Sequence, residues 1–161
     1  MRIGIIGKGF VGSAVQFGFS PNTGCDAIVK VYDKNPERSQ QSLEEVVNTS
    51  DYIFLSVPTP SNEDGTINLD IVDAALKDIN NQENKNCIIL LRSTMTPGST
   101  NLFEKKYPEL NLVFNPEFLT ERSANFDFIN QSRFILGGSK ENVEKVAELY
   151  RWRFGKSISI I

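Results

Sequence analysis

The sequence predicts an α/β protein with a doubly wound, mostly parallel sheet covered by helices on both faces. Short apolar runs alternate with segments of helical periodicity from one end of the chain to the other. With 161 residues, the chain is long enough to bury roughly 70% of the surface that it exposes when unfolded. No apolar run approaches the ~18 residues of a membrane span. We therefore expect a single α/β domain over residues 1–161.

The composition excludes several classes of function. A net charge of −3 and scattered basic residues argue against a nucleic-acid partner. The chain has no histidine, and its two cysteines, Cys25 and Cys87, lie far apart, so neither a metal site nor a histidine-based triad is expected. Without a membrane span or a signal peptide, we expect a cytoplasmic protein that binds no membrane.

The elements follow from apolar periodicity and from turn residues. Strands are expected at residues 2–6, 27–32, 52–57, 87–91, 111–115, 133–136 and 157–161. Helices are expected at 10–19, 42–48, 69–79 and 140–154, with another helix that has Pro97 as its first residue. Residues 116–127 are expected to be irregular. An apolar strand at the end of the sequence indicates a fold that normally continues further.

A glycine-rich stretch, Gly7-Lys8-Gly9-Phe10-Val11-Gly12, joins the first strand to the first helix. This G-x-G-x-x-G spacing is typical of the dinucleotide-binding turn of Rossmann-type folds. Gly7 allows the tight turn, Gly9 lets the backbone approach a pyrophosphate, and Gly12 lets the helix pack on the strand. Asp33 ends the second strand, where such folds place an acid on the adenosine ribose. The alternative is a purely structural glycine turn.

Three further loops leave strands at the edge where parallel sheets bind ligands. Together with the glycine turn, they form four blocks in the order GKGFVG at Gly7–Gly12, VPTP at Val57–Pro60 with Asp64-Gly65, STMTPGST at Ser93–Thr100, and NPEFLTERSANFDF at Asn115–Phe128 with Arg133 and Gly137-Gly138. These blocks resemble the NAD-binding domain of the nucleotide-sugar dehydrogenase family, the UDP-glucose and GDP-mannose 6-dehydrogenases.

The resemblance implies NAD as the cofactor. Asp33 would bind the ribose hydroxyls and would repel the 2′-phosphate of NADP. Arg38 matches a basic position beside the adenosine, or is a solvated surface charge. The implied cofactor-binding residues are Gly7, Lys8, Gly9, Phe10, Val11, Gly12, Asp33, Arg38, Val57, Pro58, Thr59, Ser93, Thr94 and Glu121.

The resemblance also implies catalytic roles for Glu117, Thr94 and Glu121. Glu117 is similar to the acid/base of the hydrolytic half-reaction, and Thr94 to a residue that helps to hold a water molecule. Substrate contacts are implied for Glu117, Phe118, Leu119 and Thr120. The alternative for the two glutamates is that they are solvated loop acids. Arg122 stands where many members have glycine, so the identity of the sugar stays open.

The implied activity is NAD-dependent oxidation of a nucleotide sugar, UDP-glucose or a related one, in nucleotide-sugar metabolism and polysaccharide biosynthesis. The family's nucleophilic cysteine, catalytic lysine and asparagine lie in a central helix and a C-terminal substrate domain, which do not follow Ile161. We therefore expect an NAD-binding domain that is inactive by itself and monomeric. Cys25 precedes the second strand and Cys87 begins the fourth, so both lie at amino ends. Two alternatives are a free-standing NAD or nucleotide-sugar binding module and a dehydrogenase of the β-hydroxyacid type.

Overall fold

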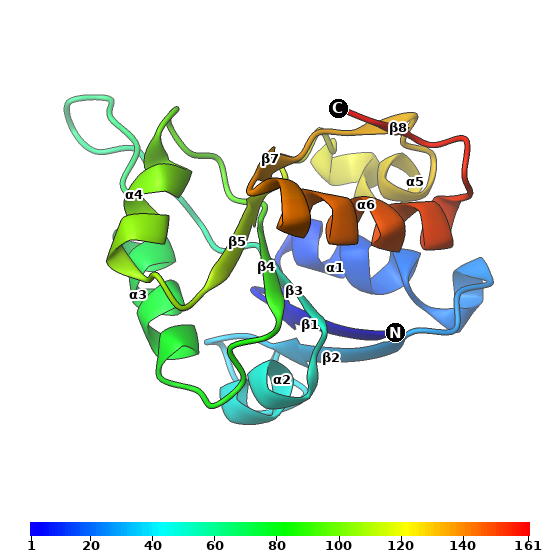
Figure 1. Ribbon diagram of the computed structural model, residues 1–161, viewed down its shortest axis with the longest axis horizontal. Coiled ribbons are helices and arrows are strands. Elements are labelled where there is room, and N and C mark those ends of the chain that lie inside the picture. The colour runs from blue at the N-terminus through cyan, green and yellow to red at the C-terminus, as the bar shows by residue number, and fades with distance from the viewer.

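A six-stranded sheet between two layers of helices forms the centre of the computed structural model, which describes residues 1–161 (Figure 1). The strand order is β2-β1-β3-β4-β5-β7. Five strands are parallel, namely β1 (Arg2–Ile6), β2 (Ile28–Tyr32), β3 (Tyr52–Leu55), β4 (Ile88–Leu91) and β5 (Asn111–Phe114), and β7 (Gly137–Gly138) runs antiparallel to β5. The predicted fold class is confirmed.

The helices divide between the two faces of the sheet. On one face lie α1 (Phe10–Gly18), α5 (Ala124–Ile129) and α6 (Lys140–Phe154), and on the other lie α2 (Leu43–Thr49), α3 (Asp70–Asn80) and α4 (Ser99–Lys106) (Figure 1). Successive side chains of a strand point to opposite faces of the pleated sheet, so each strand contributes to the cores under both layers of helices. In β3, Phe54 joins the core with α1, α5 and α6, whereas Ile53 and Leu55 join the core with α2, α3 and α4.

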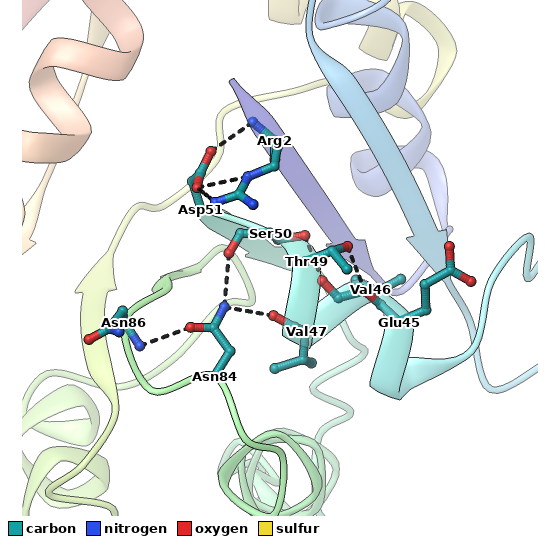
Figure 2. Close-up of polar contacts among 9 residues, drawn as sticks. All are labelled: Arg2, Glu45, Val46, Val47, Thr49, Ser50, Asp51, Asn84 and Asn86. Carbon is teal, nitrogen blue, oxygen red and sulfur yellow. Dashed lines mark hydrogen bonds and ion pairs between the residues drawn. The ribbon is translucent and has the colours of Figure 1, made fainter.

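Side-chain hydrogen bonds join the loops at the amino edge of the sheet (Figure 2). Arg2, which opens β1, binds Asp51 through its main-chain N–H (3.0 Å) and its Nε (3.1 Å). Asn84, in the loop before β4, donates to the carbonyls of Val47 (2.9 Å) and Ser50 (3.0 Å) and accepts from the N–H of Asn86 (3.0 Å). These bonds connect β1, the end of α2 and the loop that follows α3.

Most expected elements agree with the structure to within two residues at each end. The helix expected to begin at Pro97 starts two residues later, because α4 begins at Ser99. Thr96 O instead accepts a hydrogen bond from Ser99 N (3.1 Å), and Gly98 has a left-handed φ of 89°. Pro97 therefore belongs to a turn before the helix.

The segment 116–127 is not wholly irregular, contrary to expectation. It contains a 3₁₀ turn, η2 (Glu121–Ser123), and the first residues of α5. Phe128 of α5 is fully buried, and its ring lies so close to Gly18 of α1 that a Cβ at Gly18 would come within 2.2 Å of it. Packing against α1 therefore stabilises the short helix α5, which the local sequence does not predict.

The strands expected at 133–136 and at 157–161 are both shorter than expected, and a further short strand, β7, follows at Gly137–Gly138. β6 (Arg133–Phe134) pairs in parallel with β8 (Ser159–Ile160) in a separate two-stranded sheet near α5 (Figure 1). The chain then crosses to the main sheet, where β7 pairs with β5. Phe134 is buried in the core beside α6, which fixes β6 outside the main sheet.

Candidate nucleotide-binding site

The turn after β1 has the geometry expected of its first glycine. Gly7 has φ 92°, and a Cβ there would lie 2.4 Å from the Ser56 carbonyl oxygen. The N–H of Gly7 donates to Tyr32 O (3.0 Å), which continues the sheet into the turn. Only glycine combines this left-handed conformation with so close an approach of the chain after β3.

The other two glycines of the turn differ in what surrounds them. A Cβ at Gly12 would lie 2.0 Å from Gly7 O, so α1 packs directly on the turn. A Cβ at Gly9 would meet nothing within 4 Å. Gly9 is the N-cap of α1 and makes no side-chain cap, so no capping side chain occupies the first N–H groups of the helix. Free N–H groups at a helix N-terminus suit a phosphate.

Asp33 lies directly after β2, beside this turn. Its Oδ2 accepts from the main-chain N–H of Lys8 (2.6 Å), and its Oδ1 accepts from that of Asn35 (2.8 Å). The hydroxyl of Ser39 holds the main-chain N–H of Asp33 (3.1 Å). The carboxylate is therefore fixed within the turn and close to Gly7 and Gly9.

A cavity of about 530 Å³ opens at the carboxyl ends of β2, β1 and β3. Neighbouring strands β1 and β3 form the point where the strand order reverses, which is where open α/β sheets bind ligands. Six of the predicted cofactor residues line the cavity, and they are Gly7, Gly9, Asp33, Arg38, Val57 and Pro58. The structure thus brings together these six predicted cofactor residues, among them the glycines predicted to hold the pyrophosphate and the acid predicted to bind the adenosine ribose.

Helix α3 forms a wall of this cavity that sequence analysis missed. Asp70, Ile71, Ala74, Ala75 and Asp78 line it. The apolar periodicity of residues 69–79 predicts a helix, and Val72, Leu76 and Ile79 of α3 pack in the core. The overlooked signal is the spacing of Asp70, Ala74 and Asp78, which places small and acidic side chains every fourth residue on another face.

The remaining predicted cofactor residues lie outside this cavity. Ser93 is almost fully buried, and its hydroxyl donates to Val57 O (2.6 Å), which ties the loop after β4 to the loop after β3. Thr94 is exposed and Thr59 is half-buried. In the turn, Lys8 and Val11 are half-buried, and Phe10 is 42% exposed.

The predicted catalytic residues follow adjacent strands. Leu91 of β4 is paired with Phe114 of β5, so Thr94 and Glu117 are each three residues beyond a matched pair. Glu117 is half-buried, and its Oε2 accepts from the N–H of Leu119 (2.8 Å). Glu121 is exposed at the start of η2. The two loops thus leave the same edge of the sheet.

The segment that carries the predicted substrate contacts is held by Asp127. Its Oδ2 accepts from Thr120 N (2.8 Å) and from the Ser123 hydroxyl (2.9 Å). These hydrogen bonds, that of Thr120 first, lower the pKa of the Asp127 carboxyl. Phe118 is 59% exposed, whereas Leu119 packs against the core.

A buried arginine joins the bases of these two loops. Arg92 is 2% exposed, and its Nη1 donates to Asn115 Oδ1 (2.7 Å) and to the Tyr150 hydroxyl (3.5 Å). Tyr150 donates to the same Asn115 oxygen, and burial raises the pKa of Tyr150 to about 12. The guanidinium lies about 6 Å from the rings of Phe54 and Phe128, while its Nε and Nη2 have no partner. No carboxylate neutralises this charge.

Both cysteines lie at the amino edge, as expected. Cys25 precedes β2, and Cys87 directly precedes β4. Each is buried and free, and burial raises the pKa of both thiols, that of Cys87 to about 11. Elsewhere, no three side chains of the metal-ligating types gather into a group that could hold a metal ion. No helix has the length and apolarity needed to cross a membrane.

The strand order, the glycine turn, Asp33 and the cavity define a dinucleotide-binding α/β domain. The sequence model of the UDP-glucose/GDP-mannose dehydrogenase family, NAD binding domain, matches residues 24–153. The chain belongs to this family, and the predicted family and NAD as its cofactor are confirmed. The open space at Gly9 and the free helix N-terminus fit the cofactor's pyrophosphate.

Curated and solved relatives agree with this assignment. The chain is 30% identical to the UDP-glucose 6-dehydrogenase of Rickettsia felis, in an alignment that covers 93% of this chain and 41% of the relative. The structure of a UDP-glucose dehydrogenase from Pyrobaculum islandicum matches with a TM-score of 0.79 at 23% identity, over 99% of this chain and 46% of that one. The structure of the GDP-mannose dehydrogenase from Pseudomonas aeruginosa matches with a TM-score of 0.76 at 25% identity, over 94% of this chain and 44% of that one. The chain thus spans less than half the length of these proteins.

Proposed function

We propose that residues 1–161 form one domain that serves as the NAD-binding part of a UDP-sugar 6-dehydrogenase, which oxidises the C6 alcohol of a nucleotide sugar to the acid. The nucleotide sugar is UDP-glucose or a related one. The enzyme would work in the cytoplasm in nucleotide-sugar metabolism and polysaccharide biosynthesis, and this chain by itself would be a monomer.

The observation that carries the proposal is the cavity at the reversal of strand order. In it, Gly9 leaves room for a pyrophosphate, and Asp33 offers a carboxylate at the adjoining strand end. The adenosine would lie in this cavity between Asp33, Arg38 and α3. NAD, when bound, supplies the hydride acceptor that alcohol oxidation needs.

The residues beyond β3, β4 and β5 would serve the reacting end. Thr59, Ser93 and Thr94 would lie beside the nicotinamide, and the buried hydrogen bond from Ser93 to Val57 O would keep two of these loops together. Glu117 would act as a base through a bound water, with Thr94 holding that water and Glu121 contacting the nicotinamide ribose. Phe118, Leu119 and Thr120 would lie along the nucleotide sugar. Carboxylates are suitable proton acceptors in a chain that has no histidine.

We expect the chain alone to bind NAD without producing the acid. The second oxidation in the family is implied to proceed through a cysteine thioester. Cys25 and Cys87 are buried protonated thiols at the amino edge, and a strand of four or five residues separates that edge from the proposed site by roughly 15 Å. Attack on a bound aldehyde needs contact at about 3.5 Å.

Two measurements test the proposal. Titration calorimetry should show NAD binding more tightly than NADP, because a 2′-phosphate would approach Asp33. Tighter binding of NADP would contradict the assignment of Asp33. Incubation with NAD and UDP-glucose should yield no acid. Two NADH per sugar, lost in Cys25→Ser or Cys87→Ser, would contradict the placement of the thiols.

The same position of the thiols favours a second candidate, a module that binds NAD or a nucleotide sugar without turnover. A UDP-glucose titration in the presence of NAD, followed by NADH absorbance, separates the two. Binding of both ligands together with no hydride transfer, even when the family's substrate domain is added as a separate chain, favours the module.

A further inference from the structure

The wall that α3 contributes to the cavity has a distinct chemical pattern, and the inference drawn from it rests on the proposed function. Asp70, Ala74 and Asp78 are spaced four residues apart and so form one stripe along the helix. Eight residues of helix separate the two carboxylates by about 12 Å along the axis. Ala74 lies midway, so the stripe is hollow at its centre and acidic at both ends.

Apolar side chains border this hollow. Ile71, on the neighbouring stripe, lines the cavity and is 42% exposed, which is unusual for a large aliphatic side chain. Leu43 and Val57 line the same cavity from α2 and from the loop after β3. A slot with apolar walls and an acidic end suits a flat heteroaromatic ring that carries a hydrogen-bond donor on its edge.

The two carboxylates of the stripe are not equally available. Asp70 Oδ2 accepts from Asn68 Nδ2 (3.3 Å), and its main-chain N–H is held by Asn68 Oδ1 (2.8 Å). The side chain that hydrogen-bonds Asp78, from Gln82 (3.1 Å), reaches only its main-chain carbonyl. The Asp78 carboxylate is therefore free to accept a hydrogen bond from a ligand.

We propose that α3 recognises the adenine base of the dinucleotide, with Ala74 leaving the space for the ring and Asp78 accepting a hydrogen bond from the exocyclic amino group. The role makes Asp78 a specificity residue. A base with a carbonyl oxygen in place of the amino group would set one acceptor against another, and this unpaired contact lowers affinity.

The first test compares NAD with nicotinamide hypoxanthine dinucleotide, in which a carbonyl replaces the amino group. Calorimetry should give the wild-type chain a preference for NAD of at least about tenfold. In Asp78→Asn, the side-chain amide can donate to the carbonyl, so the preference should fall to within about twofold. Loss of a negative charge raises the affinity for both anionic ligands alike. The ratio of the two affinities therefore tests whether Asp78 recognises the amino group of the base.

Asp70→Asn is the matched control, because it removes the same charge from the other end of the stripe and should keep the wild-type ratio. A second variant, Ala74→Leu, should lower affinity for NAD and for ADP alike by more than about tenfold without changing the melting temperature. Asn101→Leu, which adds the same side chain to an exposed position of α4, should change neither.

The outcomes separate this inference from the function on which it rests. In one outcome the wild-type chain binds NAD without preferring it to the hypoxanthine dinucleotide, and in another Asp78→Asn retains the wild-type preference. Either result would show that α3 does not recognise the adenine base, and the proposed function would still stand. If the wild-type chain binds neither dinucleotide, both the proposed function and the inference about α3 are wrong.

Discussion

The two edges of the sheet treat their polar groups in opposite ways. At the amino edge, Arg2 and Asp51 pair with each other, and Asn84 hydrogen-bonds the carbonyls that end α2 (Figure 2). At the carboxyl edge, Gly9 faces open space and Thr94 is exposed. The amino edge thus satisfies these polar groups within the chain, whereas the carboxyl edge leaves the backbone at Gly9 and the side chain of Thr94 accessible to a ligand.

This contrast shows where stability and binding can be changed separately. Substitutions at the amino edge remove hydrogen bonds that the folded chain already makes, so they should lower the free energy of unfolding. Substitutions at the carboxyl edge should affect binding more than folding, except where the backbone itself is tightly packed. The following predictions test this division, in order of decreasing effect.

The largest effect is expected at an exception within the glycine turn. Gly12→Ala would place a Cβ 2.0 Å from Gly7 O, and displacement of α1 should cost about 3 kcal/mol of unfolding free energy. Gly9→Ala meets nothing within 4 Å, and its φ of −78° suits alanine, so it should change stability by less than about 0.5 kcal/mol. Its methyl group should nevertheless weaken NAD binding by about tenfold or more. Urea denaturation and calorimetry measure the two effects, and equal stability of the two variants would contradict the packing argument.

The next effect is expected at the amino edge. Asn84→Ala leaves the carbonyls of Val47 and Ser50 without this donor, which should cost about 2 kcal/mol. NAD affinity should not change, because the residue lies at the opposite edge. Asn81→Ala, an exposed position at the end of α3, is the control and should be neutral in urea denaturation. A loss of NAD affinity in Asn84→Ala would show that the two edges are coupled.

Smaller effects on stability are expected at the proposed nicotinamide end. Thr94→Ala and Glu121→Ala alter exposed side chains, so unfolding free energies should stay within about 0.5 kcal/mol of the wild type. NAD affinity should fall. A strong drop in melting temperature with unchanged NAD affinity would assign both residues a structural role instead.

The smallest effect should depend on pH. The hydrogen bond from Arg2 holds the pKa of the Asp51 carboxyl below its ordinary value. A lowered carboxyl pKa adds stability above the unfolded-state pKa of about 3.9, and this stability is lost as the pH falls through the folded-state value. Because the pair is exposed, Arg2→Met should lower the melting temperature at pH 7 by only about 1–2 °C. Once the pH has fallen below the folded-state pKa of Asp51, the difference from the wild type should vanish, and a difference that persists there would exclude the ion pair as its cause.

Much of the fold could be predicted because its signals are local. The apolar runs of β1 to β5 and the glycine turn place the sheet and its ligand-binding edge. Helix α5 could not be predicted, since it depends on Phe128 packing against Gly18, more than a hundred residues earlier in the chain. The split of residues 133–138 between two sheets has the same origin, because the burial of Phe134 beside α6 decides it.

The candidate site also contains residues that local motifs predict and residues that only the tertiary structure brings together. The glycine turn and Asp33 follow strands directly, and motif spacing found them. Ala74 and Asp78 of the α3 wall belong to no motif, and their four-residue spacing indicates a binding surface only once the helix is known to line the cavity. The register of β4 and β5 places Thr94 and Glu117 at comparable positions, but the side chains that meet a substrate depend on loop conformations that no period in the sequence specifies.

The buried Arg92 links three distant positions in a way that bears on how this sequence can evolve. A guanidinium carries five N–H donors and no acceptor, so its charge must be met by acceptors in the surrounding side chains and backbone. Replacing Asn115 or Tyr150 alone would leave that charge with fewer partners in an apolar interior, and replacing Arg92 alone would remove one hydrogen bond from each of their oxygens. The residues at these three positions should therefore covary among relatives, so that a change at one position is accompanied by changes at the other two.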